Sequence, residues 1–145
     1  MNIKIAIASD HAGFKIKETV RLYLQGKGFE INDLGTFSEE STDYPDFAHL
    51  LAKAVEQQQF DLGILVCGSG NGVNMTANKY PGIRSALCWI PEIARLARLH
   101  NNANVLAMPG RFVDEKTAKQ ITDAFLETEF EGGRHQRRVD KIACK

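Results

Sequence analysis

The sequence lacks several features that mark particular classes of protein. Its eighteen lysines and arginines are balanced by eighteen acidic residues, so the chain has no net charge with its histidines neutral. Proteins that bind nucleic acid or membrane surfaces are usually basic, and we expect neither partner. No apolar run exceeds about six residues, against the ~20 that a membrane-spanning helix needs. The first residues do not have the pattern of a signal peptide.

Cysteine is also scarce. The three cysteines, Cys67, Cys88 and Cys144, are far apart and form no C-x-x-C pair. An odd number of dispersed cysteines is typical of reduced thiols, which persist in the cytoplasm. We therefore expect a cytoplasmic protein without a disulfide framework.

What is present is the composition of an ordinary globular domain. Apolar residues make up 43% of the chain and charged residues 25%, which argues against disorder. Its 145 residues fit the usual size of one domain. We expect a single domain over residues 1–145 that ends in a basic tail at residues 130–145.

Apolar runs of strand length alternate with segments of helical pattern. The runs lie at residues 3–8, 29–34, 62–66, 85–89 and 104–108. Helices are expected at residues 14–25, 45–57, 73–79, 91–100 and 114–127, with further helix in the tail. Parallel strands need crossovers that cover the sheet, so the alternation predicts an α/β fold. We expect a three-layer αβα Rossmann-like sandwich with a five-stranded parallel sheet, whose ligands bind at the carboxyl ends of the strands.

Two of these strand ends carry residues capable of chemistry. Asp10 and His11 follow the first strand, although such a pair is often only a helix cap and a surface imidazole. Cys67 ends the third strand and is followed by Gly68-Ser69-Gly70-Asn71-Gly72. Backbone N–H groups of a glycine-rich loop can approach an anion closely. A free cysteine is commonly a small buried apolar residue, but its place beside this loop favours a reactive thiol.

Several familiar motifs of glycine-rich or cysteine-containing loops are not present in this sequence. A dinucleotide fingerprint would need glycine, and a cysteine phosphatase would need arginine, where this chain has Val73. The G-K-[ST] of a P-loop is absent. What remains is a thiol beside an anion-binding loop.

The second half of the chain contributes a histidine and a basic cluster. His100 falls at the expected end of a helix, where the helix dipole alone can favour it. Arg134 and Arg138 would share one face if the tail is helical. Two guanidinium groups on one face can bind a phosphate, although a solvated basic face is the alternative.

Together these segments resemble the family of type B ribose-5-phosphate isomerases, which also includes galactose-6-phosphate isomerase subunits. The resemblance runs through nearly the whole chain in order. It is carried by Ser9-Asp10-His11-Ala12-Gly13-Phe14, Thr42-Asp43-Tyr44-Pro45, Cys67-Gly68-Ser69-Gly70-Asn71-Gly72, Ala77-Asn78-Lys79, Pro81-Gly82-Ile83-Arg84, His100-Asn101 through Asn104-Val105, and Glu131-Gly132-Gly133-Arg134-His135.

The resemblance implies an aldose–ketose isomerase that interconverts ribose 5-phosphate and ribulose 5-phosphate. It implies that His100 opens the sugar ring as general acid–base with Asp10 nearby. Cys67, as thiolate, would then move a proton from carbon 2 to carbon 1. The Ser69 hydroxyl and the backbone donors of the loop would stabilise the cis-enediolate; the loop residues are Gly68, Gly70, Asn71 and Gly72.

The resemblance also implies the remaining ligands and the assembly. Phosphate would be bound by His11, Arg134 and Arg138, with Arg111 as a further candidate, and Tyr44 and Asn101 would line the sugar site. No metal and no cofactor is implied. Family members are dimers or tetramers that share sites between subunits, so we expect a homodimer or homotetramer in which His100 or Arg111 acts across an interface.

Some positions depart from the family pattern, and they bear on the identity of the sugar and on the base. Ser69 stands where many members have threonine, which keeps the hydroxyl. Some members use a glutamate where this chain has Val73, a side chain that cannot accept a proton. The alternatives are an isomerase of a six-carbon sugar phosphate, such as allose or galactose 6-phosphate, and a sugar-phosphate-binding module without activity.

Overall fold

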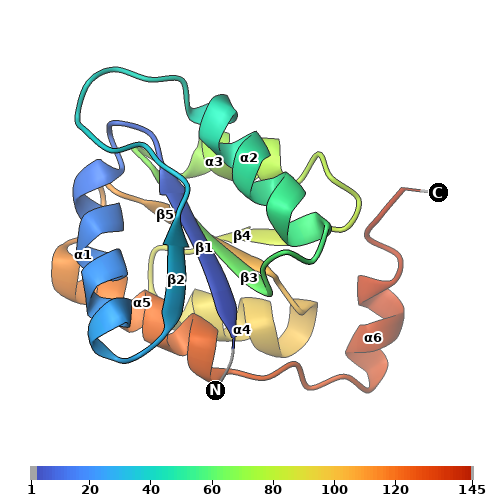
Figure 1. Ribbon diagram of the computed structural model, residues 1–145. Helices are drawn as coiled ribbons and strands as arrows, with labels where there is room; N and C mark the ends of the chain where they lie inside the picture. Colours follow the sequence, from blue (N-terminus) through green and yellow to red (C-terminus); the bar gives the residue numbers. More distant parts are fainter. Residues whose placement is uncertain (1–2, 145) are drawn as a thin grey trace.

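The structure is a computed structural model, and it describes residues 3–144. Strands and helices alternate along the chain (Figure 1). The strands are β1 (Lys4–Ser9), β2 (Glu30–Asp33), β3 (Leu62–Cys67), β4 (Ser85–Leu87) and β5 (Val105–Pro109). The helices are α1 (Phe14–Gly26), α2 (Tyr44–Glu56), α3 (Asn71–Ala77), α4 (Pro91–Asn101), α5 (Glu115–Glu127) and α6 (Arg134–Val139).

All five strands form one parallel sheet in the order β2-β1-β3-β5-β4. The predicted α/β class and five-stranded parallel sheet are therefore confirmed. The sequence pattern leaves the strand order open. From β1 the chain adds β2 on one side of the sheet and then β3 on the other, so the winding direction reverses between β1 and β3. In doubly wound sheets this reversal opens a crevice at the carboxyl ends of the two strands. Asp10 follows β1 and Cys67 ends β3, so both lie at this crevice.

The two faces of the sheet carry different side chains. On one face, isoleucines and other large residues such as Ile7, Ile64 and Met108 pack against α1, α4 and α5. On the other face, alanines such as Ala6 and Ala107 pack against α2 and α3. Successive strand residues point to opposite faces, so this alternation lets helices cover both sides. Figure 1 shows α2 and α3 above the sheet and α4 and α5 below it.

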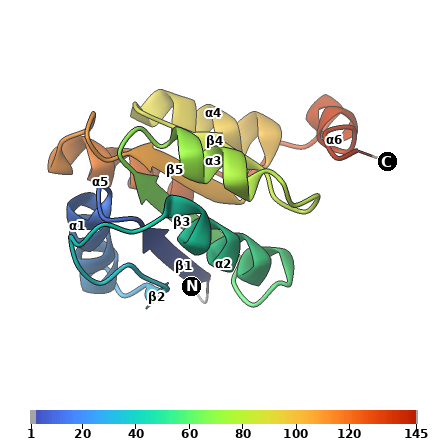
Figure 2. The same ribbon diagram turned by 90° about the horizontal axis from the view of Figure 1, so that it is seen from above.

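Three elements differ from the sequence prediction by more than one residue at a bound. Strand β4 ends at Leu87 rather than residue 89, because the chain leaves the sheet before Pro91, which begins α4. Helix α3 begins at Asn71, inside the glycine loop, instead of at Val73. Of tail residues 130–144, only Arg134–Val139 is helical; this helix, α6, packs on α4 and lies outside the layers (Figures 1 and 2). Among residues 3–144, no helix is both long and apolar enough to span a bilayer.

Candidate active site

A pocket of about 490 Å³ opens where β1 and β3 end. We call it the Cys67 pocket. Its walls come from the turn after β1, the start of α2, the glycine loop and the turn after β5. They are formed by Asp10, His11, Ala12, Tyr44, Cys67, Gly68, Ser69, Asn71, Gly72, Met75, Arg111 and Phe112. The structure thus brings together, in one chain, most of the residues singled out at the two strand ends.

Cys67 lies at the floor of this pocket. It is the last residue of β3, and only 4% of its surface is exposed. The other two cysteines have different surroundings. Burial raises the pKa of the Cys88 thiol to about 12, so Cys88 is uncharged and unreactive at neutral pH. Cys144 is exposed in the tail. Cys144 lines a separate cavity, so Cys67 is the cysteine that lies in the pocket of the glycine loop.

Steric crowding accounts for two glycines of the loop. Gly70 has a φ of +77°, and a Cβ there would overlap the Leu87 side chain. A Cβ on Gly72 would overlap the ring of Tyr44. The loop therefore packs against β4 on one side and against the start of α2 on the other. This close packing holds its backbone at the mouth of the pocket.

The loop also presents polar groups to the pocket. Ser69 Oγ accepts a hydrogen bond from the backbone N–H of Asn71 at 3.2 Å. Helix α3 begins at Asn71, and the first N–H groups of a helix have no partner within the helix. Ser69, Asn71 and Gly72 all line the pocket. The loop therefore offers donors to negative charge that develops near Cys67.

His11 is held on the opposite wall by a reciprocal pair of hydrogen bonds. Its backbone N–H donates to Thr42 Oγ1 at 3.1 Å, and its Nδ1 accepts from the Thr42 N–H, also at 3.1 Å. Because Nδ1 is an acceptor, the proton of the neutral ring must be on Nε2. His11 therefore presents an N–H donor, which matches the phosphate ligand that the resemblance implies.

Asp10 has a structural role in this chain. It is 6% exposed, and its Oδ1 accepts a hydrogen bond from Gly13 N at 3.0 Å. This contact fixes the turn that leads from β1 into α1. The carboxylate also lines the Cys67 pocket, so it is available to a ligand there.

Arg111 belongs to the same wall as the glycine loop. Its N–H donates to the Gly68 carbonyl at 3.0 Å. A Cβ built on Gly68 would lie 3.2 Å from Arg111 Nη1, so the guanidinium rests against the loop backbone. Arg111 therefore lies within its own chain's Cys67 pocket and needs no interface to reach it.

The other predicted site residues lie at the opposite end of the molecule, near the amino ends of the strands. Helix α4 starts beyond the carboxyl end of β4 and runs back, so His100 and Asn101 lie near the amino ends of the strands. There Asn101 lines a separate cavity of about 430 Å³. Arg134 and Arg138 are in α6, which packs on α4. Within a single chain His100 and Asp10 are therefore at opposite ends of the strands, so the prediction that they act together requires a second copy of the chain.

Comparison with known proteins identifies the relatives of this fold and pocket. The sequence model of the ribose/galactose isomerase family matches residues 5–142. The chain belongs to this family. It is 48% identical to ribose-5-phosphate isomerase B of Escherichia coli over 141 residues, which are 97% of this chain and 95% of the relative.

Solved structures agree with this family membership. A ribose 5-phosphate isomerase from Thermotoga maritima has a TM-score of 0.97 and 55% identity, over 99% of both chains. Ribose-5-phosphate isomerase B from Mycoplasma genitalium, solved with bound ribulose-5-phosphate, has a TM-score of 0.93 and 49% identity. That match covers 98% of this chain and 95% of the relative. The predicted resemblance is confirmed.

Four residues of this family member's site were missed by sequence reasoning. Thr42 positions His11, and Ala12, Met75 and Phe112 line the pocket. Thr42 lies in a matching motif, but its bonds to a residue 31 positions earlier have no sequence signal. Met75 and Phe112 are 66% and 77% exposed, which is unusual for large apolar side chains on a single chain.

Proposed function

We propose that Cys67 is the base of an isomerase that interconverts ribose 5-phosphate and ribulose 5-phosphate. The reaction is that of the named relatives, one of which was solved with ribulose-5-phosphate bound. The observation that carries the assignment of the base is the position of Cys67. It is a thiol at the floor of a pocket whose walls hold the glycine loop on one side and His11 on the other.

The chemistry needs a base and preorganised donors together. A Cys67 thiolate removes the proton from carbon 2 of the open-chain aldose, and the electron pair of that C–H bond forms the C1=C2 bond of an enediolate. The oxyanion that develops is stabilised by the Ser69 hydroxyl and the loop N–H groups. The hydroxyl proton on O2 passes to O1, and transfer of the proton from the thiol to carbon 1 then leaves C2=O, which gives the ketose and restores the thiolate.

The phosphate is assigned to the cationic wall of the pocket. His11 Nε2–H and the Arg111 guanidinium are donors in the same chain, and a guanidinium binds phosphate through paired N–H groups. In this assignment Tyr44 lines the sugar site. Arg134, Arg138, His100 and Asn101 would come from a second copy of the chain.

The shape and surface of one chain support such a shared site. His100 and the two tail arginines are at the amino ends of the strands, whereas Cys67 is at a carboxyl end. Large apolar side chains, Met75, Trp89 and Phe112, are exposed around the pocket mouth. Exposed apolar clusters of this kind are typical of protein interfaces. We therefore propose a homodimer or homotetramer whose sites form between copies, and a cytoplasmic location consistent with three free cysteines.

The test replaces Cys67 by alanine and measures both the rate of isomerisation and the affinity for the sugar phosphate. Isomerisation of ribose 5-phosphate in a coupled assay is expected to fall by at least about a thousandfold, since proton transfer by a positioned base contributes 10²–10⁴-fold and often acts with other groups. Calorimetric affinity for ribulose 5-phosphate should stay near the parental value.

The matched control is Cys144→Ser, which removes the exposed tail thiol and should leave the rate unchanged. Assaying the parent across five- and six-carbon aldose phosphates identifies the preferred sugar. Undiminished turnover by Cys67→Ala would exclude Cys67 as the base. Loss of ligand affinity together with rate would instead assign Cys67 to binding.

A further inference from the structure

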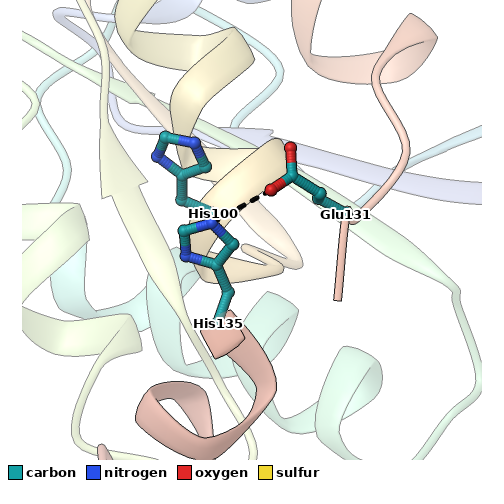
Figure 3. A group of neighbouring side chains, drawn as sticks. All are labelled: His100, Glu131 and His135. Carbon is teal, nitrogen blue, oxygen red and sulfur yellow. Dashed lines mark ion pairs between the residues drawn. The ribbon is translucent and has the colours of Figure 1, made fainter. Parts of the chain in front are cut away.

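Two histidines and a glutamate lie together at the end of α4 that is far from the Cys67 pocket. His100 is in the last turn of α4, Glu131 precedes α6, and His135 is in α6. One ligand atom of each lies within 4.8 Å of the other two. In Figure 3 the two rings lie one above the other, with the Glu131 carboxylate beside them. We propose that this cluster binds a divalent transition-metal ion of the Zn²⁺ type, and that the bound ion inhibits the enzyme.

A buried nitrogen aimed into the cluster is the observation that points to a ligand. The His135 side chain is 8% exposed. Its Nε2 atom is shielded from solvent and has no hydrogen-bond partner among residues 3–144. It lies 3.2 Å from Glu131 Oε1, but outside the geometry of a hydrogen bond. Buried polar atoms of native proteins usually have a partner. This nitrogen carries a lone pair or an N–H group that can bind a ligand.

The donor set is one that zinc favours. Two imidazoles and one carboxylate form a common set of three protein ligands, with the fourth position left to water. The 3.2 Å between His135 Nε2 and Glu131 Oε1 is close to the edge of about 3.3 Å that metal–ligand bonds of ~2.0–2.1 Å produce in a tetrahedron. Two of the three donors are thus already spaced for a metal.

The third donor reaches the metal by a change of ring orientation. The His100 and His135 rings are stacked, with centroids 4.3 Å apart and planes inclined by 15°. Stacked rings present faces to each other, whereas a metal is bound at the ring edge, so the His100 ring must turn. His100 is only partly buried and Glu131 is half exposed, which leaves both free to move. His135 is held among buried groups and provides the fixed point.

The surrounding charges permit a cation here. Glu131 contributes the negative charge of the cluster, while Arg134, Arg137 and Arg138 in α6 are exposed and carry their charge into solvent. Neutral imidazoles bind metal without a charge of their own, and metal binding competes with their protonation. The proton transfers proposed above are carried out by protein side chains, so an ion at this site would regulate the reaction instead of taking part.

Inhibition follows from His100, and this part of the inference rests on the proposed function. If His100 opens the sugar ring in a site shared with a second copy, a metal bound to its ring nitrogen removes the lone pair that accepts or delivers the proton. Inhibition would then occur without any contact between the ion and the Cys67 of the same chain. It should act on the ring-opening step and so lower kcat for the cyclic sugar phosphate.

The test of binding uses Co²⁺ as a coloured substitute for Zn²⁺ on the tag-free protein. We expect visible d–d bands of a four-coordinate site with no thiolate charge-transfer band, and displacement of Co²⁺ by Zn²⁺. In His135→Gln and in Glu131→Gln, the affinity for Co²⁺ should fall by about a hundredfold or more, since even outer-shell partners are worth 10–100-fold. Glu131 is exposed, so Glu131→Gln leaves the packed interior unchanged. His49→Gln and Cys144→Ser, which alter a histidine paired with Tyr80 outside the cluster and the tail thiol, should bind like the parent.

The test of inhibition measures isomerisation at increasing Zn²⁺ for each protein, relative to its own metal-free rate. Parental inhibition should weaken in parallel with Co²⁺ affinity in His135→Gln and Glu131→Gln. The metal site is overturned if Co²⁺ does not bind, or if both variants bind it like the parent. It is also overturned if binding produces a sulfur band that disappears in Cys67→Ala. Normal Co²⁺ binding by a protein that has no isomerase activity would overturn the proposed function and leave the metal site standing.

Discussion

At the residue scale, the chemistry of a side chain in this pocket is set by one or two neighbours. His11 alone could have either ring nitrogen protonated, and the N–H of Thr42 at 3.1 Å from Nδ1 assigns the proton to Nε2. The same residue accepts the His11 backbone N–H through its hydroxyl. Thr42 therefore acts through His11 and is a positioning residue for the proposed phosphate site.

The variant Thr42→Val tests this positioning role. It keeps the shape of the side chain and the bond to the ring, but leaves the His11 backbone N–H without its acceptor. We expect the KM for ribose 5-phosphate to rise by about fivefold, which corresponds to the ~1 kcal/mol of a typical hydrogen bond. The kcat should stay close to the parental value, because the base and the loop are untouched.

Thr42→Ser is the matched control, since it retains the hydroxyl and should retain the parental KM. Steady-state kinetics of the two variants separate the hydrogen bond from the methyl group. If Thr42→Val lowered kcat and left KM alone, His11 would have to be assigned to the chemical step instead of to phosphate.

At the element scale, a buried lysine joins α1 to β2 and to the loop that follows it. Lys17 in α1 is fully buried, and its ammonium donates to both oxygens of Asp33, at 2.8 and 2.7 Å, and to the Thr36 carbonyl. Asp33 ends β2 and also accepts from the N–H of Gly35. The pair therefore fixes the start of the segment that carries Thr42 to His11.

Removing this lysine should destabilise the fold more than removing an exposed cation. In Lys17→Met the carboxylate of Asp33 loses its main partner, and loss of one member of a buried pair costs about 3–5 kcal/mol. Asp33 keeps some contact with solvent and lies 3.7 Å from Arg21. We therefore expect the lower end of that range, about 3 kcal/mol, in the free energy of unfolding measured with urea.

Two further variants show whether the buried charge is responsible. Lys17→Met combined with Asp33→Asn should recover much of the loss, because no unpaired carboxylate then remains. Arg95→Ala, which breaks an exposed ion pair with Glu92, should leave the urea midpoint unchanged. A Lys17→Met protein as stable as the parent would mean that the pair contributes nothing net to folding.

At the scale of the whole molecule, the proposed catalytic groups are divided between two ends of the fold. Cys67 and His11 lie at the carboxyl edge of the sheet, whereas His100 and the α6 arginines lie at the other end. A rigid sheet and a helix of the length of α4 hold these ends apart. One chain therefore cannot bring all of these proposed groups together, and the proposed assembly would supply the missing half.

Mixing two inactive variants tests this division directly. Cys67→Ala and His100→Asn are each expected to be inactive as pure proteins. After mixing in equal amounts and re-association, a two-fold symmetric dimer should recover about a quarter of the parental activity, since half of the dimers are mixed and each of these has one intact site.

Recovery of activity would require residues from different chains in one site. A mixture that stays inactive, although native mass spectrometry shows that subunits have exchanged, would place Cys67 and His100 of the same chain in each site. That result would contradict the separation of the two residues across the sheet.

The sequence determined the α/β class, the five strands and the position of the Cys67 loop, because these depend on local periodicity and on glycines close together in the chain. It also identified the family from motifs in order. Only the tertiary structure decided the strand order, the packing of Tyr44 on Gly72 and the distance between His100 and Asp10. These depend on how crossovers pack segments that are distant in sequence.

The cluster of His100, Glu131 and His135 illustrates the same limit. Glu131 and His135 are four residues apart, but His100 comes from another helix, and no spacing in the chain joins it to them. The burial that leaves His135 Nε2 without a partner in the part of the chain that the structure describes arises only when α6 packs on α4. Local chemistry can be read from the chain, whereas contacts between distant segments are fixed by the packing of the folded molecule.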